Sequence, residues 1–539
     1  MTQTQKNFVK GAAILGAAGL IVKVIGALFR IPLANVVGTE GMGYYQMAYP
    51  VYTLLLTVST AGLPTAVSKL VSERVAQGDF AGAHHTFLAA RRALLVIGAA
   101  ASILMCALAG PVSRLQATAP AMYALMAISP ALFFVSVLSA YRGYFQGLQN
   151  MAPTALSQLA EQAGKLAAGL SIAYFLLQKT QNPAFGAMGA LLGVTLSEAA
   201  ALLYIMGVYG RRKRGILVNI PPREQRMAQG DFRPAVKRIL AIAVPVTLGA
   251  CVMPVVAAID SVIVPRVLQE IGYAQKEATS MYGVLTGVVN PLINMPAALS
   301  LALAMSLVPA ISQSGAQGDI EGVKGKASFG FKLALLVGLP CATGFIVLAR
   351  PILMLLYKNI QGSELAMAAA LFAMLSFGVL FLTLVQTMTG ILQGLGKPLL
   401  PVFSLIAGAS VKVVASVLLI RAPSINIYGA AAGTLCCYAI AAVMDVVFVI
   451  RHAGLRVSLA GHIVKPVLAT AVMGACAWLI YRAAGPHSNT VGVLAAVLVG
   501  AAVYILMLAA LRGLTEEELT MLPGGGRITK VMRKLRIWK

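Results

Sequence analysis

The chain has 539 residues, of which 59% are hydrophobic and only 11% are charged, and its mean hydropathy is +0.84. This composition excludes a soluble globular protein. The formal net charge of +25 would suggest nucleic-acid binding in a soluble chain. In a membrane protein such charge comes from basic loops, so no nucleic-acid partner is expected.

Fourteen apolar stretches follow one another between residues 11 and 511. Each has the roughly 20 residues that a helix needs to cross a hydrocarbon core of about 30 Å. The sequence therefore predicts an all-α integral membrane protein with 14 transmembrane helices. The predicted spans are 11–35, 44–68, 93–113, 120–141, 154–178, 184–209, 239–264, 282–311, 329–349, 364–392, 398–420, 428–450, 463–481 and 490–511.

The basic residues in and beside the connections indicate how the helices are oriented. Of these 38 Lys and Arg residues, 30 belong to the two termini or to connections on the same side as the termini. Arg142 is one of these 30 residues, because it directly follows the fourth predicted span and so falls in a connection. Because positively charged loops stay in the cytoplasm, the sequence predicts a multi-pass protein with both termini cytoplasmic.

The sequence also repeats itself at a displacement of 247 residues. This displacement spans six helices, an even number, so the two copies would insert in the same orientation. We therefore expect two six-helix lobes related by a pseudo-two-fold axis along the membrane normal, with a site between them. The matched features are the segments YFQGL (144–148) and ILQGL (391–395), Ser157 and Ser404, and Lys165 and Lys412.

This repeat predicts five parts of the chain. They are an N-lobe at 1–210, a basic cytoplasmic linker at 211–238, a C-lobe at 239–450, a two-helix hairpin at 451–511 and a basic amphipathic cytoplasmic tail at 512–539. In the tail, basic residues alternate with apolar ones after a run of three glycines, which is typical of a helix lying on an anionic membrane surface.

Two cations, Lys23 and Arg30, lie inside the first predicted span. A charge at this depth costs roughly 2.5–3.5 kcal/mol, so such residues usually face a polar cavity. The two are seven residues apart and share a helix face about 10 Å long, which suits a diphosphate. The alternative is that both side chains extend towards the membrane interfaces.

Other polar residues within predicted spans extend the candidate site. Glu161 and Lys165 are spaced to pair on one helix, and either a neutral pair or a role in the cavity fits this spacing. Asp260 lies in the seventh predicted span, the counterpart of the first, 230 residues after Arg30. It is a candidate partner for Arg30 in a gate, or an ion-coupling residue like Glu161. The candidate substrate-binding residues are therefore Lys23, Arg30, Lys165, Asn290, Asn294 and Lys412. Glu198 and Asp445, late in the two lobes, are interpreted as structural.

No enzyme signature is present: the sequence has no P-loop and no H-E-x-x-H motif. The six cysteines fall within apolar stretches and the five histidines are scattered, so no metal site is predicted. We therefore expect a protein that is not an enzyme and has no cofactor, with Na⁺ coupling, H⁺ coupling and the membrane potential alone left open as driving forces.

Two stretches resemble a known family. Residues 11–73 (GAAILGAAGLIVKVIGALFRIPLANVVGTEGMGYYQMAYPVYTLLLTVSTAGLPTAVSKLVSE) and 139–162 (SAYRGYFQGLQNMAPTALSQLAEQ) are similar to the polysaccharide-exporter branch of the multidrug/oligosaccharidyl-lipid/polysaccharide (MOP) superfamily. Within that branch they resemble the SpoVB/YtgP group, which includes MurJ-like lipid II flippases. The resemblance extends over essentially the whole chain.

The resemblance implies a flippase in the bacterial cell (plasma) membrane. It would move a polyprenyl-diphosphate-linked sugar, with lipid II for peptidoglycan synthesis as the leading candidate, from the inner to the outer leaflet by alternating access. Lys23 and Arg30 match the basic first helix of such flippases, and the last two helices would line a groove for the lipid tail. MurJ-like proteins also carry arginines in the second and eighth helices, where this chain has no charge before Lys69 and offers asparagines.

Two other functions stay open on the sequence. A cation-coupled multidrug exporter of the same superfamily would favour acidic rather than basic cavity residues. A membrane scaffold for cell-wall or sporulation assembly, which transports nothing, would tolerate loss of Lys23 and Arg30. The expected partners are lipid II, membrane lipids and the cell-wall synthesis machinery, and the protein is expected to be a monomer.

Overall fold

A computed structural model of the chain describes residues 3–218, 232–455 and 457–513. Within these ranges the side chains of 3–17, 20, 23, 24, 27, 212–218, 245, 298, 302 and 303 lie outside the description. The predicted amphipathic tail and most of the predicted linker therefore fall outside the described residues.

The described residues form helices and no strands, and twelve of the helices are long and apolar enough to cross a membrane. The prediction of an all-α, multi-pass membrane protein is confirmed. The described chain divides into two compact units, a first unit at 1–288 and a second unit at 289–539. The predicted count of 14 spans, the pseudo-two-fold axis and the boundaries of the two lobes stay predictions.

The first unit forms, in its described residues, α-helices of 9 to 58 residues and a short π-helix. In chain order its elements are α1 (Gln3–Thr60), α2 (Leu63–Ala76), α3 (Phe80–Leu115), α4 (Ala121–Gly147), α5 (Ala152–Gly164), the π-helix η1 (Lys165–Gly169), α6 (Leu170–Thr180), α7 (Pro183–Val218), α9 (Arg233–Ala250), α10 (Val252–Glu270) and α11 (Gln275–Gly283).

The helix boundaries differ from the predicted spans where an apolar run is bent rather than ended. The first two predicted spans join in α1, which is 58 residues long and kinked at Gly38. Gly38 has φ of 70°, a left-handed conformation that glycine adopts without a steric penalty. The fifth predicted span is broken by η1, and the seventh is divided at Cys251 between α9 and α10. Hydrophobicity alone cannot reveal such breaks, because the residues on both sides are equally apolar.

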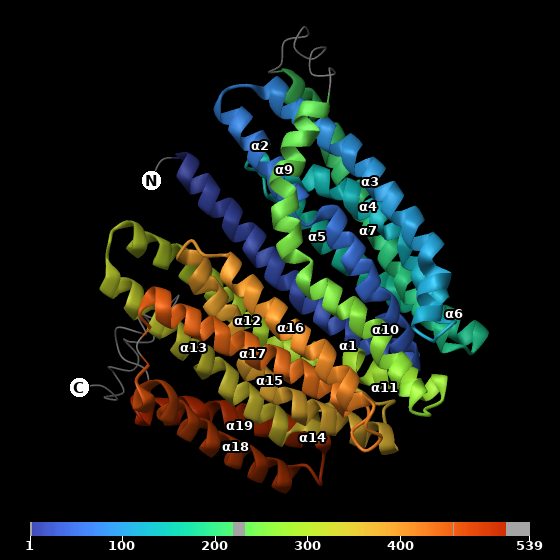
Figure 1. Cartoon of the computed structure of the whole chain (residues 1–539), viewed down its shortest axis with the longest axis vertical. Coiled ribbons are helices and arrows are strands. Elements are labelled where there is room, and N and C mark those ends of the chain that lie inside the picture. Colours follow the sequence, from blue (N-terminus) through green and yellow to red (C-terminus); the bar gives the residue numbers. More distant parts are fainter. Residues whose placement is uncertain (1–2, 219–231, 456, 514–539) are drawn as a thin grey trace. The chain divides into compact units, whose positions relative to one another are not determined.

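α1 packs against α4, α5, α7, α10 and α11, and Figure 1 shows α3, α4 and α7 running side by side. A hydrophobic core lies between α2, α3, α4, α7 and α9. Its centre is aromatic: the ring of Phe87 stacks on Tyr144 at 4.4 Å, and Tyr141 and Tyr209 surround it. This core holds α4 and α7, which carry two residues of the site described below.

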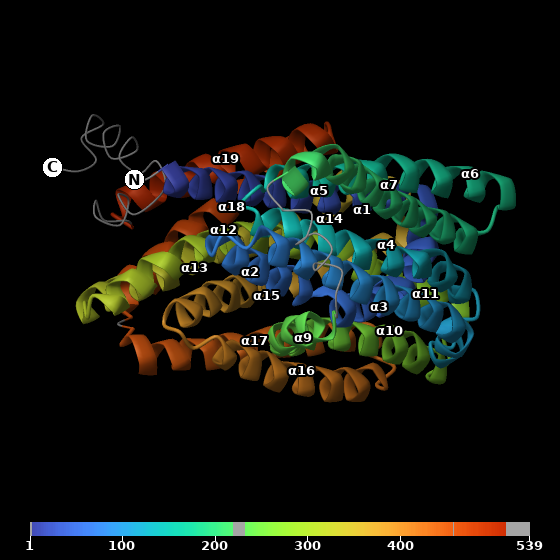
Figure 2. The same cartoon turned by 90° about the horizontal axis from the view of Figure 1, so that it is seen from above.

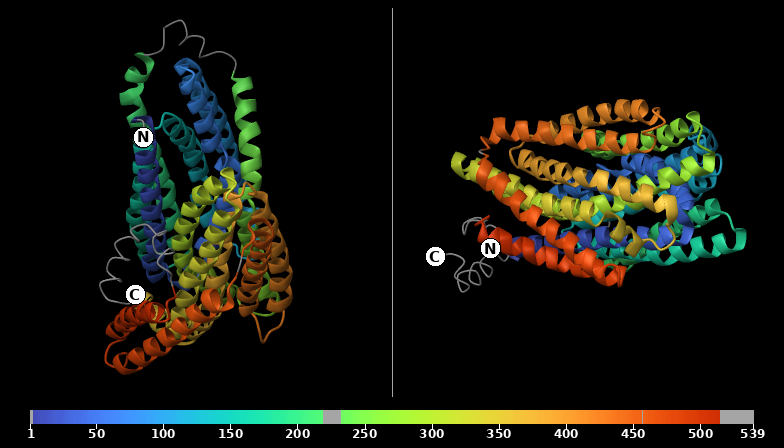
Figure 3. Two further views of the ribbon diagram at one scale, coloured as in Figure 1. Left: turned by 90° about the vertical axis from the view of Figure 1, so that its left-hand side faces the viewer. Right: turned by 90° about the horizontal axis from the view of Figure 1, so that it is seen from below.

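The second unit begins within the π-helix η2 (Val284–Val289), which continues α11. α15 packs against α12, α13 and α17, and α16 packs against α17 (Figure 2). α18 and α19 form a hairpin beside α13, coloured orange to red in Figure 3. The elements are α12 (Asn290–Ala316), α13 (Ile320–Val347), α14 (Ala349–Leu356), α15 (Gly362–Gly394), α16 (Leu399–Ile420), α17 (Tyr428–Ala453), the π-helix η3 (Leu459–Val464), α18 (Lys465–Ala484) and α19 (Asn489–Ala510).

In the first unit, η1 and α7 approach each other closely where two glycines meet. A Cβ atom added at Gly193 on α7 would collide with the backbone of Gly169 in η1. Small residues at helix contacts allow such close backbone approach in membrane proteins. This contact fixes the position of η1, and with it that of Lys165, its first residue.

We predict that Gly193→Ala destabilises the protein by about 1–3 kcal/mol, because overpacking forces the two helices apart. Gly207→Ala on the same helix is the matched control. A Cβ atom there meets nothing within 4 Å, so this variant should be unchanged or slightly stabilised. Thermal unfolding of the purified proteins in detergent measures the difference, and equal melting temperatures for the two variants would contradict the tight η1–α7 contact.

Candidate functional site

A group of tyrosines on α1 lies beside Arg30. The guanidinium carbon of Arg30 is 5.8 Å from the centroid of the Tyr49 ring. The Tyr49 ring stacks on Tyr45 at 5.5 Å and contacts Tyr52 at 5.8 Å. Spacings of four and three residues place these rings on one helix face. Tyr45, Tyr49 and Tyr52 are called the tyrosine ladder below, and a cation over such a ring gains roughly 0.5–2 kcal/mol.

Four charged residues from neighbouring elements form a polar cluster within the first unit: Arg142 on α4, Glu161 on α5, Lys165 at the start of η1 and Glu198 on α7. Arg142 donates from Nη2 to Glu161 Oε2 at 3.0 Å. Lys165 Nζ lies 3.9 Å from Glu161 Oε1. Glu198 interacts electrostatically with Glu161, Lys165 and Arg142. Glu161 and Lys165, whose spacing allowed a pair, thus form one in the structure, and Arg142 is a second cation beside Glu161.

The polar cluster is shielded from solvent. Lys165 is 8% exposed and Glu198 is 3% exposed. Arg142 also donates from Nε to Ser157 Oγ at 2.9 Å, which fixes the guanidinium plane against α5. Breaks in helical hydrogen bonding such as η1 occur frequently at functional sites, and this one begins at Lys165.

The polar cluster and the tyrosine ladder form one continuous site. Tyr45 and Tyr49 interact electrostatically with Lys165, and Arg30 also acts on Tyr45. Tyr52 interacts with Glu161 and Glu198. The first unit therefore places Arg30 and the Arg142–Glu161–Lys165 group near the same three phenol rings. Such an arrangement can bind an anion by cationic groups and by hydroxyl donors.

The remaining predicted site residues of the first unit are only partly placed. Lys23 belongs to α1, but its side chain lies outside the described residues. Asp260 on α10 is partly buried and interacts electrostatically with Tyr282. The pairing of Arg30 with Asp260 stays a prediction.

Three predicted residues belong to the second unit. Asn290 begins α12 and is partly buried, and Asn294 is exposed and donates to the backbone carbonyl of Asn290 at 2.8 Å. Lys412 is partly buried on α16. Their roles in substrate binding stay predictions.

The second unit repeats part of the polar cluster with different chemistry. Residues 247 positions after Ser157, Lys165 and Glu198 are Ser404, Lys412 and Asp445, whereas Arg142 and Glu161 correspond to Thr389 and Gly408. Ser404 and Thr389 lie beside Asp445, which is fully buried. The helices that carry these residues pack in the same combinations in both units. Only the first unit, however, has the arginine–glutamate pair.

Arg142 and the tyrosine ladder are the site residues that sequence reasoning missed. Arg142 was assigned to a cytoplasmic connection because the fourth apolar stretch ends at Tyr141, but α4 continues to Gly147. The signal that could have identified Arg142 as a site residue was Glu161, an acidic residue 19 positions later that needs a cationic partner. The spacing of Tyr45, Tyr49 and Tyr52 was the available signal for a shared face.

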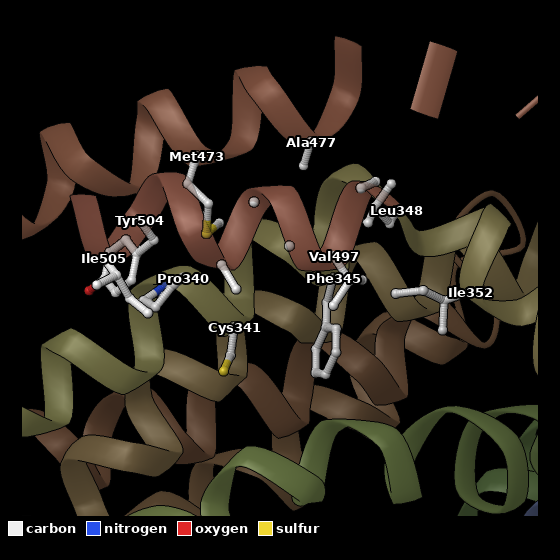
Figure 4. A pocket seen from close by; sticks show the side chains of 14 residues that line it. Pro340, Cys341, Phe345, Leu348, Ile352, Met473, Ala477, Val497, Tyr504 and Ile505 are labelled. Atoms are coloured by element: carbon white, nitrogen blue, oxygen red, sulfur yellow. The ribbon is translucent and has the colours of Figure 1, made fainter. Parts of the chain in front are cut away.

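An apolar cavity of about 340 Å³ lies in the second unit among α13, α14, α18 and α19. Figure 4 shows Phe345 from α13, Met473 from α18, and Val497 and Tyr504 from α19 around it. The Tyr504 hydroxyl donates to the backbone carbonyl of Leu336, so the ring presents its apolar face. The lining suits a hydrocarbon chain rather than a polar ligand.

Two family profiles match the chain. One, described as polysaccharide biosynthesis protein, matches residues 8–314, and the other, MatE, matches residues 245–418. Stage V sporulation protein B of Bacillus subtilis (strain 168) is 27% identical over 97% of this chain and 99% of that protein. Lipid II flippase MurJ of the same organism is 26% identical over 93% of this chain and 94% of that protein.

Solved structures show the same fold. The lipid II flippase MurJ in an inward closed conformation superposes with a TM-score of 0.65 at 15% identity, covering 92% of this chain and 98% of that chain. An inward-facing multidrug resistance MATE family transporter of the MOP superfamily has a TM-score of 0.65 at 17% identity, covering 80% and 94%. The relatives whose names state an activity are a flippase and a transporter, not enzymes.

We predict that Arg142→Gln destabilises the protein by about 3–5 kcal/mol, because it leaves the Glu161 carboxylate, only 14% exposed, without its closest cationic partner. Arg266→Gln is the matched control. Arg266 pairs with Glu270 at 3.2 Å in an exposed position, so its loss should cost less than about 1 kcal/mol. Thermal unfolding in detergent distinguishes the two, and similar small losses would show that the Arg142–Glu161 pair contributes little to stability.

Proposed function

Because this chain belongs to the polysaccharide biosynthesis protein family, we propose that it is a flippase for a polyprenyl-diphosphate-linked sugar precursor. The substrate we propose is lipid II, moved from the inner to the outer leaflet by alternating access. The observation that carries the proposal is the cationic site of the first unit, where Arg30, Arg142 and Lys165 outnumber the one carboxylate, Glu161, that pairs with two of them.

A buried excess of positive charge is costly unless something negative compensates it. The tyrosine ladder supplies hydroxyl donors near Arg30 and Lys165, and a diphosphate accepts from both kinds of group. The partly buried Arg30 can present a planar fork and Lys165 a point charge. This combination supports an anionic headgroup better than a cationic drug.

The apolar cavity of the second unit supports the other half of such a substrate. A polyprenyl chain is a long hydrocarbon, and burying each CH₂ group gains about 0.8 kcal/mol. The cavity among α13, α18 and α19 is lined almost entirely by apolar side chains. A lipid-linked diphosphate is the class of molecule that uses both a cationic and an apolar surface.

The membrane potential can drive this transport without ATP. Moving one charge through 100 mV is worth about 2.3 kcal/mol, so a diphosphate with two negative charges gains about 4–5 kcal/mol on moving outward across an inside-negative membrane. Charges that move with the protein would reduce this gain. Coupling to Na⁺ or H⁺ through Asp260 or Glu161 is the alternative source of energy.

A cation-coupled multidrug exporter is the second candidate function. The MatE profile match at 245–418 and the structural likeness to the multidrug resistance transporter favour it. Such an exporter would bind organic cations, and the three cations of the site, Arg30, Arg142 and Lys165, would repel them. Binding of a lipophilic cation but not of a prenyl diphosphate would favour this function over the flippase.

We predict that the protein flips lipid II in liposomes and that the Arg30→Ala/Lys165→Ala variant flips at least tenfold more slowly. Each lost charge-assisted contact to the diphosphate is worth roughly 1.5–3 kcal/mol. The assay follows the accessibility of the headgroup to an external probe, with and without an inside-negative potential. Lys179→Ala, which removes an exposed cation at the end of α6, is the control and should flip normally.

Normal flipping by the double variant would remove the cationic site from the mechanism. Failure of folded wild type to flip or bind lipid II would instead point to another polyprenyl-linked glycan or to the exporter. Two results together would indicate a scaffold: the wild-type protein binds no lipid-linked substrate, and cells that carry only the double variant grow normally.

We also predict that Gly344→Leu weakens binding of a long-chain prenyl diphosphate more than that of a short-chain analogue. Gly344 lines the apolar cavity, and a Cβ atom there meets nothing within 4 Å, so the leucine would project into the cavity. Gly325→Leu on the same helix is the matched control, because its Cβ is also unobstructed but lies outside the cavity. Equal affinity of Gly344→Leu for both chain lengths would exclude this cavity as the tail site.

A further inference from the structure

The start of α9 is held against α3 by an aromatic ring, away from the candidate site. The ring of Phe232, the residue before α9, stacks on the ring of His85 with the centroids 4.7 Å apart. The guanidinium carbon of Arg92 lies 4.2 Å from the centroid of the same Phe232 ring. His85 and Arg92 are seven residues apart and so lie on one face of α3. Phe232 therefore fixes the level at which α9 packs on α3.

The Arg92 guanidinium is oriented but not neutralised. Its side chain is exposed, and in the described part of the chain it has neither an acidic partner nor a hydrogen-bond acceptor. A guanidinium over an aromatic ring gains cation–π energy and keeps its N–H donors for another acceptor. Because Phe232 already holds Arg92 in place, an anion that accepts from these N–H groups requires little further ordering of the side chain.

Lys237 brings a second cation to the same end of α9. It follows Phe232 by five residues, which is about 7.5 Å along the helix axis. It is exposed and, like Arg92, has no partner among the residues that the structure describes. Neighbouring cations use up the nearby acidic group, since Lys69 and Arg238 both pair with Glu73. Positive charge therefore exceeds negative charge where α2, α3 and α9 meet.

Exposed apolar side chains follow both of these cations on their own helix faces. On α3 they are Leu95 and Val96, three and four residues after the cation, and these are 47% and 66% exposed. On α9 they are Leu240 and Val244, three and seven residues after the cation, and both are exposed. Such spacings place side chains on one face of a helix. Each helix thus has a cation at one end of an exposed apolar face, as expected at a membrane–water interface.

We propose that Arg92, Lys237 and the exposed apolar residues that follow them, together the α3–α9 surface, bind an anionic phospholipid of the bilayer. The lipid phosphate accepts from the two cations, and the acyl chains lie along the apolar faces of α3 and α9. Both cations belong to the predicted cytoplasmic side, where the leaflet is negatively charged. A soluble phosphate would leave the apolar residues without a contact. The inference does not depend on the proposed flippase function, because these residues lie outside the candidate site.

The double variant Arg92→Gln/Lys237→Gln tests this surface by removing two exposed charges. Arg114→Gln/Lys179→Gln is the matched control, because it removes two exposed cations from the C-terminal ends of α3 and α6. The probe is dioleoyl phosphatidylglycerol, titrated into the full-length protein in detergent while native mass spectrometry counts the bound lipid. Two ligands serve for comparison: dioleoyl phosphatidylcholine has the same chains without net charge, and glycerol phosphate has the charge without the chains.

We expect the wild-type protein to bind phosphatidylglycerol more tightly than phosphatidylcholine. The Arg92→Gln/Lys237→Gln variant should bind phosphatidylglycerol about tenfold to thirtyfold more weakly, because each basic residue at an anionic membrane surface contributes to the affinity. Its binding of phosphatidylcholine, and all binding by the control variant, should stay unchanged. Equal affinity of the wild type for the two lipids, or an equal loss in the two double variants, would overturn the site. Displacement of the bound lipid by glycerol phosphate would overturn the lipid as the occupant and indicate a soluble anion.

Phe232→Leu tests whether the aromatic ring prepares Arg92 for the lipid. Leucine keeps an apolar contact with α3 but removes the ring beside the guanidinium. Phosphatidylglycerol should then bind about twofold to tenfold more weakly, because the Arg92 side chain must be ordered on binding. A purely structural role of Phe232 would lower the binding of both lipids equally, so the ratio of the two affinities is the measurement. An unchanged ratio would overturn the role of the ring in lipid binding.

Discussion

The site of the first unit depends on one requirement: a cation inside a membrane-spanning bundle must have a negative partner nearby. Arg142, Lys165 and Glu161 meet this requirement together, with Glu161 between the two cations. The rest of the local structure keeps them there. The aromatic core around Phe87 fixes α4 against α7, and the glycine contact between Gly169 and Gly193 fixes η1. Removing the carboxylate would leave two buried positive charges without compensation.

The incomplete neutralisation is the functionally informative part of this arrangement. A fully paired cluster would only stabilise the bundle, whereas this one leaves Arg30 over an aromatic ring and gives two cations one ionised carboxylate. Glu198 lies beside this group and is 3% exposed, and its Oε2 has no hydrogen-bond partner among the described residues.

Comparison of the two repeats shows how one helix arrangement supports different chemistry. Both units contain a serine, a lysine and an acidic residue at equivalent positions on helices that pack in the same combinations. The second unit has Thr389 and Gly408 where the first has Arg142 and Glu161. Asp445 therefore faces hydroxyl groups rather than an arginine. In this sense the units share a scaffold, and the charge that supports anion binding belongs to the first one.

The sequence by itself determined the all-helical membrane class, the internal repeat and the presence of charge within the apolar stretches, because hydrophobicity and charge are properties of residues in order along the chain. It also offered a Glu161–Lys165 pair as one of two interpretations, since residues four apart on a helix are neighbours. Only the tertiary structure decided that Arg142 and Glu198 join this pair, because they come from other helices, 19 and 37 positions away from Glu161. The kink at Gly38 and the π-helix at Lys165 were likewise decided by packing, since backbone breaks within uniformly apolar runs leave no mark on hydropathy.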